Sequence, residues 1–348
     1  MFKQFDKLFG IDLGTSNTVI FEKGKGIVLN EPSVIAFNQH TGELLAAGSE
    51  ALAMIGRAPA HVDISYPLSN GVIANFNKTS IMLKYFIKKI QGRPSLLRSS
   101  QIYISVPCGI TNVQKRAIEE TIVHKGAKKA IAVEEPIAAA LGAGLRLDEP
   151  IGHLVLDIGG GTCQVAVLSL GGIVASHTIN RGGLSIDRDI IEYVKRQYNM
   201  DIGERTAEFI KTQIGTAMAS TTERTLDIRG RDMVDGLPRS IRLTSSEIYP
   251  VVNEFLGVLI EAIRATLEIC PPELAGDVME QGILLCGGGA LLEGIDERIR
   301  YETGIPVHIA DHPLECTALG TGMMLGGSRA RSRAITKEDT MVEEASVG

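Results

Sequence analysis

The chain has 348 residues, of which 44% are apolar and 22% charged, so it is long enough for about two or three globular domains and is neither fibrous nor disordered. Its net charge of −6 gives no general attraction to nucleic acid, and we expect no nucleic-acid partner. The five cysteines form no C-x-x-C pair, which argues against a disulfide framework or a metal cluster. No signal peptide and no run of 18 apolar residues is found, so a cytoplasmic protein is expected.

The first segment, residues 1–9, is predicted to be an amphipathic membrane anchor. On a helical wheel its apolar side chains fall within about 120° of arc, and two lysines lie on the opposite side. The apolar residues are Phe2, Phe5, Leu8 and Phe9, and the lysines are Lys3 and Lys7. A helix this short is marginal alone, and Leu8 and Phe9 can equally begin the first strand.

A strand, turn, strand unit occurs twice in the sequence. Residues 8–28 and 154–174 both contain two apolar runs around a turn of small and hydroxyl-bearing residues. The same offset separates Asp12 from Asp157 and Gly14 from Gly159. Two unrelated glycine hairpins are the alternative, but the shared layout favours two copies of one fold facing each other.

The other predicted elements form an α/β pattern. Between the two units, residues 79–91 and 112–125 have helical spacing and residues 101–107 alternate as a strand does. The second half predicts helices at 185–198, 203–218 and 246–269, short strands within 219–244, and a strand with a glycine-rich turn at 282–292. Residues 327–348 have the composition of a disordered tail.

Three glycine-rich turns each follow an apolar run, at residues 14–18, 159–162 and 286–291. Glycine lets backbone N–H groups approach an anion closely, and hydroxyl groups add donors. Two of these turns carry an aspartate, Asp12 and Asp157, and carboxylates suit a hydrated Mg²⁺. The pattern therefore predicts a nucleoside triphosphate held from both sides. Neither a Walker A loop nor a Rossmann fingerprint is present.

These turns belong to a set of segments that carries a family resemblance. The set includes IDLGTSNT (11–18), ISVPCGIT (104–111), VEEPIAAALGAGL (133–145), LDIGGGT (156–162) and CGGGALL (286–292). Over about residues 8–326 the chain resembles the superfamily of actin, sugar kinases and heat-shock chaperones, and within it the MreB family of bacterial actin homologues. The resemblance implies an actin-like α/β fold of two duplicated domains around a nucleotide cleft, each with a smaller subdomain. The domains would span 10–145, with the subdomain at about 33–70, and 146–326, with the subdomain at about 182–244.

The resemblance also implies which residues hold ATP and Mg²⁺. Asp12 and Asp157 would face the metal, Glu135 would orient the attacking water, and Thr162 would be its partner. The phosphates would be held by Gly14, Thr15, Ser16, Asn17, Thr18, Gly159, Gly160, Gly161 and Thr162; the ribose by Glu208, Phe209, Ile210 and Lys211; and the adenosine by Gly287, Gly288, Gly289, Ala290 and Leu291. Without the family, Glu208 and Lys211 are simply an i,i+3 surface pair.

The sequence departs from the family pattern beside this site. The family usually has Thr-Thr-Glu where this chain has Thr162, Cys163 and Gln164, and Gly-Asp-Glu where it has Gly183, Leu184 and Ser185. The loss of three carboxylates predicts that nucleotide binding is retained while metal coordination or the hydrolysis rate changes. A divergent paralogue is one interpretation.

The resemblance implies an ATPase that forms filaments on the inner face of the cytoplasmic membrane, organises cell-wall synthesis and maintains rod shape. Its partners would be further copies of itself, in homopolymeric filaments of paired protofilaments, together with an anionic membrane surface and membrane proteins of the cell-wall elongation machinery. Leu96 and Leu97, between Arg93 and Arg98, are a second candidate for membrane contact. The alternatives are a filament scaffold with weak hydrolysis and a small-molecule kinase of the same superfamily.

Overall fold

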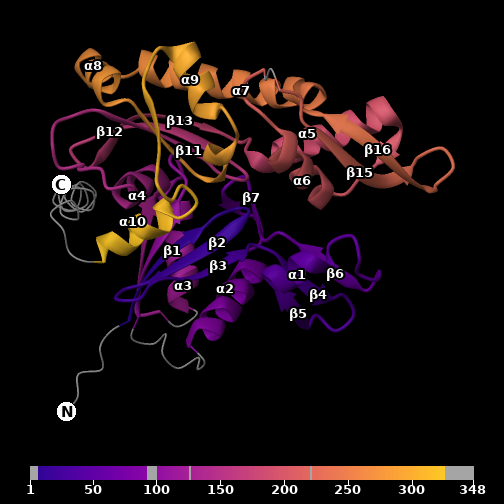
Figure 1. Cartoon of the computed structure of the whole chain (residues 1–348). Helices are drawn as coiled ribbons and strands as arrows, with labels where there is room; N and C mark the ends of the chain where they lie inside the picture. The colour runs from indigo at the N-terminus through magenta and orange to yellow at the C-terminus, as the bar shows by residue number, and fades with distance from the viewer. Residues whose placement is uncertain (1–6, 92–99, 125–126, 220–221, 326–348) are drawn as a thin grey trace.

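The computed structural model describes residues 7–91, 100–124, 127–219 and 222–325. Its framework is a pair of five-stranded sheets, one from each half of the chain (Figure 1). The first sheet has the order β10-β9-β1-β2-β3. Its strands are β1 (Leu8–Leu13), β2 (Asn17–Glu22), β3 (Gly26–Pro32), β9 (Gln101–Val106) and β10 (Lys129–Glu134).

The second sheet repeats the topology of the first. Its order is β13-β12-β11-β17-β18, with β11 (His153–Ile158), β12 (Cys163–Ser169), β13 (Gly172–Ile179), β17 (Ile283–Cys286) and β18 (Val307–Ile309). In both sheets the first three strands pair antiparallel and the last two add in parallel beside the first. The repeat of the Asp-x-Gly hairpin in the sequence is therefore a repeat in the structure.

Each half carries a smaller unit, and both lie on the same side of the molecule (Figure 1). The first has the sheet β5-β4-β6, and the second the sheet β14-β15-β16. Their elements are β4 (Ile35–Asn38), β5 (Leu44–Ala47), α1 (Ser49–Met54) and β6 (Val62–Ser65) in the first, and β14 (Met200–Asp201), α6 (Glu204–Ile214), β15 (Thr225–Asp232) and β16 (Pro238–Thr244) in the second. A two-stranded hairpin, β7 (Leu68–Ser69) with β8 (Val72–Ile73), follows the first unit.

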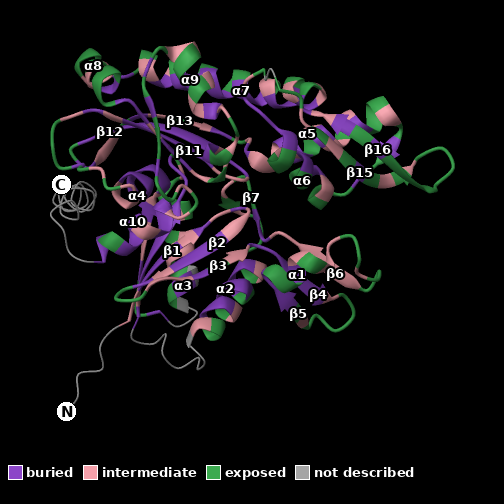
Figure 2. Cartoon of the chain, in the orientation of Figure 1, coloured by how far each residue is buried: buried purple, intermediate pink, exposed green. Residues whose placement is uncertain are grey.

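Helices cover the two large sheets on their outer faces and separate them in the middle. The helices α2 (Phe76–Gln91) and α3 (Asn112–His124) pack on the first sheet, and α5 (Gly183–Tyr198) and α7 (Ser245–Glu268) on the second. The buried strands and inward helix faces appear in purple in Figure 2. Three further helices in the second half are α8 (Pro272–Gln281), the 3₁₀ helix η2 (Gly288–Leu291) and α9 (Ile295–Thr303). No described helix is both long and apolar enough to span a bilayer.

Two helices, α4 (Glu135–Gly142) and α10 (Cys316–Met324), lie between the sheets (Figure 1). Helix α4 packs on β11 and β12 of the second sheet, whereas α10, near the end of the described chain, packs on β1 and β2 of the first. Their backbones meet at two glycines: a Cβ on Gly142 would overlap the carbonyl of Cys316, and one on Gly320 would overlap the carbonyl of Ala138. Glycine is required here because only a hydrogen fits between the two helices.

Gly320→Ala is expected to lower the free energy of unfolding by about 1–3 kcal/mol, because the added methyl group forces α4 and α10 apart. Gly257→Ala in α7 is a matched control, since a Cβ there meets no atom within 4 Å, and alanine in a helix is expected to stabilise by about 0.5–1 kcal/mol. Urea unfolding followed by circular dichroism measures both. Equal stability of the Gly320→Ala variant and the wild type would contradict the close contact.

Two helix boundaries differ from the sequence prediction by three or four residues, each for a local reason. Helix α2 begins at Phe76, before the predicted residue 79, because the Asn75 side chain accepts a hydrogen bond from the Lys78 N–H at 3.0 Å and caps the first turn. Helix α6 ends at Ile214 instead of residue 218, because Gly215 has an extended backbone.

The predicted N-terminal anchor is wrong in its last two positions. Leu8 and Phe9 begin β1, and Phe9 is 2% exposed within the core of the first sheet. Because this segment is a strand and not a helix, alternate side chains point to opposite faces of the sheet, and Phe9 points into the core. Phe2 and Phe5, Leu96 and Leu97, and the tail 327–348 lie outside the described residues.

Candidate nucleotide site

A cavity of about 620 Å³ lies between the two halves, where the repeated hairpins face each other. The turns after β1 and β11 form one end together with the start of α5, where the Gly183 N–H donates to the Gly159 carbonyl at 3.0 Å, and η2 and one side of α6 line the rest. Most of the predicted site residues line it: Asp12, Gly14, Thr15, Ser16, Asn17, Glu135, Asp157, Gly159, Gly160, Gly161, Thr162, Glu208, Lys211, Gly287, Gly288, Gly289 and Leu291. The chain thus brings together segments that are more than 250 residues apart.

Four predicted residues do not line the cavity. Thr18 is fully buried in β2, where its hydroxyl is 2.9 Å from that of Ser33. Ile210 and Ala290 belong to the core of the second half, and Phe209, about half exposed, is absent from the cavity wall. These assignments are corrected, because helix and strand periodicity turn alternate residues of a binding segment away from the cavity.

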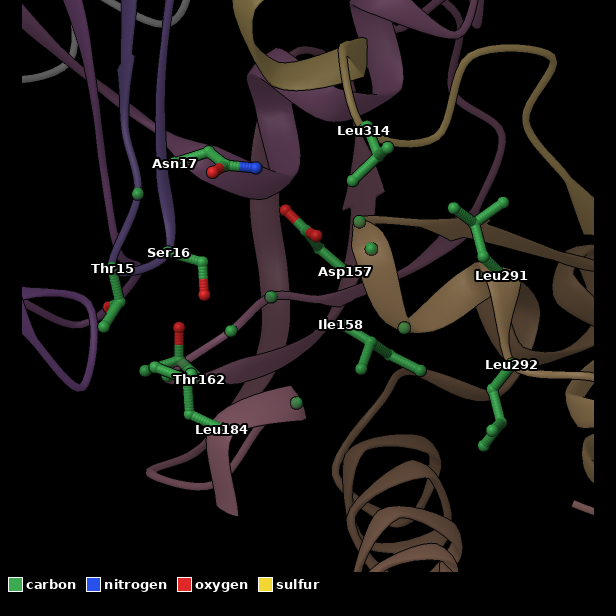
Figure 3. A pocket seen from close by; sticks show the side chains of 18 of the residues that line it. Thr15, Ser16, Asn17, Asp157, Ile158, Thr162, Leu184, Leu291, Leu292 and Leu314 are labelled. Carbon is green, nitrogen blue, oxygen red and sulfur yellow. The ribbon is translucent and has the colours of Figure 1, made fainter. Parts of the chain in front are cut away.

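The two hairpin turns are in direct contact across the cavity. A Cβ on Gly160 would overlap the Ser16 hydroxyl, and one on Gly161 would crowd Thr15. The Thr15 hydroxyl also accepts a hydrogen bond from the Gly71 N–H at 2.9 Å. Figure 3 shows Ser16 and Thr162 pointing toward one another from opposite sides. The glycine-rich turns of both halves therefore border one small space, and such turns suit a polyphosphate because their backbone can approach it closely.

The far end of the cavity is apolar. Leu291, Leu292 and Leu314 line it opposite the hairpins (Figure 3), and Leu291 is 61% exposed. Gly287 has a φ of +79°, and a Cβ on it would overlap the Asp157 carboxylate, so a glycine is needed for this turn to reach the cavity. An apolar wall beside a polar one suits a base attached to a phosphate chain. Leu292 and Leu314 were missed because no sequence pattern marks them.

Three buried carboxylates lie where the hairpins meet α4. Burial raises the pKa of Asp12 to about 6, although the Ser105 hydroxyl donates to its Oδ1 at 2.7 Å. Burial and the charge of Asp12 raise the pKa of Asp157 to about 7. Burial, Asp12 and Asp157 together raise the pKa of Glu135 well above its usual value. The three groups repel one another in a site of low dielectric.

A divalent cation fits this arrangement. Its charge would offset the repulsion among the three carboxylates, and oxygen ligands suit Mg²⁺. Among the described residues no three His, Cys, Asp or Glu side chains are placed to share one metal ion. Asp12 and Asp157 would therefore hold Mg²⁺ through its waters and the phosphates, in agreement with an ion that keeps much of its hydration shell.

The stability of the nucleotide-free protein is expected to fall as the pH rises through these pKa values. Because folding raises the pKa of Asp12 to about 6 and of Asp157 to about 7, the folded state binds protons more tightly than the unfolded state. The stabilising effect is full below about pH 4 and is lost by about pH 8, a loss of up to about 7 kcal/mol for the two groups together. Urea unfolding in EDTA measures it. Asp157→Asn should reduce the slope, and an unchanged slope would contradict the assignment.

The predicted ribose side contains an ion pair that the sequence did not indicate. Lys211 Nζ lies 2.8 Å from the Asp187 carboxylate and donates to the Gly183 carbonyl at 3.0 Å. Burial raises the pKa of Asp187 to about 6 even though Lys211 opposes the shift. Asp187 and Lys211 both line the cavity, with Glu208 beside them. Lys211 thus ties α6 to the start of α5, so these two helices share one wall of the site.

A comparison with known families agrees with this geometry. The family model described as MreB/Mbl protein matches residues 6–333, nearly the whole chain. The chain belongs to the MreB/Mbl family. The family assignment made from the sequence is confirmed.

Individual MreB/Mbl relatives match over similar lengths. The chain is 48% identical over 321 residues to the cell shape-determining protein Mbl of Bacillus cereus, which covers 92% of this chain and 96% of that protein. The solved structure of MreB5 of Spiroplasma citri bound to AMPPNP matches with a TM-score of 0.88 at 35% identity, covering 99% of both chains. A MamK double helical filament matches with a TM-score of 0.76 at 21% identity, covering 93% of this chain and 99% of that one. The actin-like fold is thereby confirmed.

The departures from the MreB/Mbl pattern occupy different environments. Leu184 lines the cavity, whereas the Ser185 hydroxyl donates to the Gly182 carbonyl at 2.8 Å at the start of α5. Cys163 is fully buried, and burial raises the pKa of its thiol far above the usual range, so it is an inert apolar side chain. Gln164 is buried beside Glu135, and its amide donates a hydrogen bond to that carboxylate.

Proposed function

We propose that this chain is a membrane-associated cytoskeletal ATPase whose filaments organise cell-wall synthesis and maintain rod shape. The single observation that carries the proposal is the cavity between two copies of one hairpin, in a chain of the MreB/Mbl family. The relatives' names support the role in cell shape, and the MreB5 structures with AMPPNP and with ADP support a nucleotide in this cavity. The MamK filament supports assembly of this fold into polymers.

The residues present suggest how hydrolysis would proceed. The turns after β1 and β11 would bind the phosphates, and Mg²⁺, when bound, would neutralise charge on them. Glu135 would accept a hydrogen bond from the attacking water and hold it in line with the terminal phosphate, with the Thr162 hydroxyl on the other side of the space. For a reaction dominated by positioning, a fixed acceptor beside the phosphates is what the protein must supply.

The membrane proposal rests on the sequence before β1. With Phe9 in the core, Phe2 and Phe5 are the apolar residues left for an anchor, and Lys3 would add attraction to anionic lipid, whereas Lys7 is paired with Glu22 at 3.5 Å. So few side chains give weak binding by one subunit. A filament presents many anchors together, and attachment should therefore accompany assembly.

Electron microscopy of the purified protein on anionic liposomes, with and without ATP, tests the proposal. We expect filaments bound to liposomes only with ATP and Mg²⁺, and loss of liposome binding but not of filaments when Phe2 and Phe5 are changed to serine. Filaments without phosphate release would favour a scaffold with weak hydrolysis, and ADP production that depends on an added sugar would favour a kinase. Absence of filaments under all these conditions would contradict the proposal.

A further inference from the structure

Gln164 makes two hydrogen bonds that cross from one half of the molecule to the other. It lies in β12 of the second sheet and is 1% exposed. Its Oε1 accepts from the Cys108 N–H at 2.7 Å, and its Nε2 donates to Glu135 Oε2. Cys108 follows β9 and Glu135 follows β10, both strands of the first sheet. One carboxamide thus joins the second hairpin to two segments of the first half.

The orientation of this carboxamide is determined by its surroundings. A backbone N–H can only donate, so the atom of Gln164 that faces Cys108 must be the oxygen. The amide nitrogen then faces Glu135, and the Glu135 carboxylate must accept. With Oε2 held in this way, Oε1 is the oxygen of Glu135 left to accept a hydrogen bond from a water. The amide therefore selects one orientation of the carboxylate.

Glu135 needs such a partner because its surroundings are otherwise unfavourable to a fixed carboxylate. It is the first residue of α4, followed by Pro136, and no side chain caps that end of the helix. Asp12 from β1 and Asp157 from β11 both repel it. The Gln164 amide is a neutral donor that stabilises the charged carboxylate without adding another charge.

We propose that Gln164 is a positioning residue for hydrolysis, which holds the Glu135 carboxylate in the orientation needed for the attacking water and does so only while the two halves lie as they do here. This inference rests on the proposed function, because it presumes that Glu135 acts on the water. It gives Gln164, one of the three positions where a family carboxylate is absent, a direct role in the reaction. The absence of a carboxylate at position 164 therefore does not indicate that the chain has lost hydrolysis.

The test is a double-mutant cycle in the full-length chain. Gln164→Met keeps the side-chain volume and removes both hydrogen bonds. We expect phosphate release at saturating MgATP to fall about 10–100-fold, the range for a misplaced catalytic group, while ATP affinity stays within about two-fold. In a Glu135→Ala background the same change should have no further effect, because Gln164 acts only through Glu135.

Thr178→Val is the matched control. Thr178 is paired with Gln164 across β12 and β13, and its hydroxyl lies 3.5 Å from Cys108 Sγ. The variant removes a polar group from the same place without touching Glu135, so we expect hydrolysis within about two-fold of wild type. Gln164→Asn, with a shorter side chain that cannot reach both partners, is used should the methionine variant fail to fold. It is expected to lower phosphate release several-fold with unchanged ATP affinity.

The outcomes separate the inference from the function on which it rests. Wild-type phosphate release by both Gln164 variants, with loss in Glu135→Ala, overturns the inference and leaves the function standing. The inference is also overturned if the losses of phosphate release from Gln164→Met and Glu135→Ala add in the double mutant, or if Thr178→Val loses as much release as Gln164→Met. Either result indicates that Gln164 has a merely structural role. Wild-type release by Glu135→Ala overturns the assigned role of Glu135 and the inference with it.

Discussion

Glu135→Ala should lower the rate of phosphate release by at least about 100-fold and leave ATP affinity within about two-fold of wild type. The carboxylate lines the cavity beside the two hairpins and is held by Gln164, whereas we propose that the phosphates are bound mainly by backbone N–H groups of the glycine-rich turns. Loss of a water-orienting group affects the transition state and not the ground state. Phosphate release and the binding of a fluorescent ATP analogue measure the two quantities separately.

Glu134→Ala is the control for this prediction. Glu134 directly precedes Glu135 but lies beside Lys115 at 3.7 Å and is absent from the cavity wall. We expect hydrolysis by this variant to stay within about two-fold of wild type. If the two alanine variants hydrolyse ATP equally well, the water-orienting carboxylate is not Glu135.

Asp12→Asn and Asp157→Asn are each expected to weaken MgATP binding about 10–100-fold and to reduce its dependence on Mg²⁺. Each substitution removes one of the carboxylates whose charge the cation would offset, while the amide keeps the side-chain volume. The affinity for ATP in EDTA should not fall and is expected to rise, because without the cation these carboxylates repel the phosphates. Titration with a fluorescent nucleotide, with Mg²⁺ and in EDTA, gives the comparison.

The control for the aspartate variants is Asp227→Asn, which removes an exposed carboxylate paired with Arg242 on the β15–β16 hairpin. Its affinity for MgATP should equal that of the wild type, since surface ion pairs contribute little. Equal Mg²⁺ dependence in all four proteins would show that the cation does not bind between Asp12 and Asp157.

Much of the fold could be predicted because its signals are local. The hairpin at residues 8–28 has two apolar runs around a turn that contains glycine, and the long helix ends where Pro271 and Pro272 follow it. The strand predicted at 101–107 is β9, within one residue. The repeated Asp-x-Gly unit pointed to a site between two halves, since each copy places its turn at the end of a buried strand.

Some residues were wrongly predicted to line the site because a motif locates a segment of backbone but not the direction of each side chain on it. Thr18 and Ile210 lie inside segments that do reach the cavity, yet both point into the protein interior. Helix and strand geometry sends neighbouring residues in different directions. A motif therefore locates the backbone of a binding site, and the packing of that backbone determines which of its side chains face the ligand.

The sequence by itself determined the elements, the repeat and the glycine-rich turns, because turn chemistry and apolar periodicity act over a few residues. Only the tertiary structure decided that Phe9 belongs to the core, that residue 320 must be glycine because the α4 backbone packs against it, and that Gln164 holds Glu135. Each of these depends on a contact between segments far apart in the chain. Such contacts arise when both sheets pack on α4 and α10, and no local pattern encodes which atoms then meet.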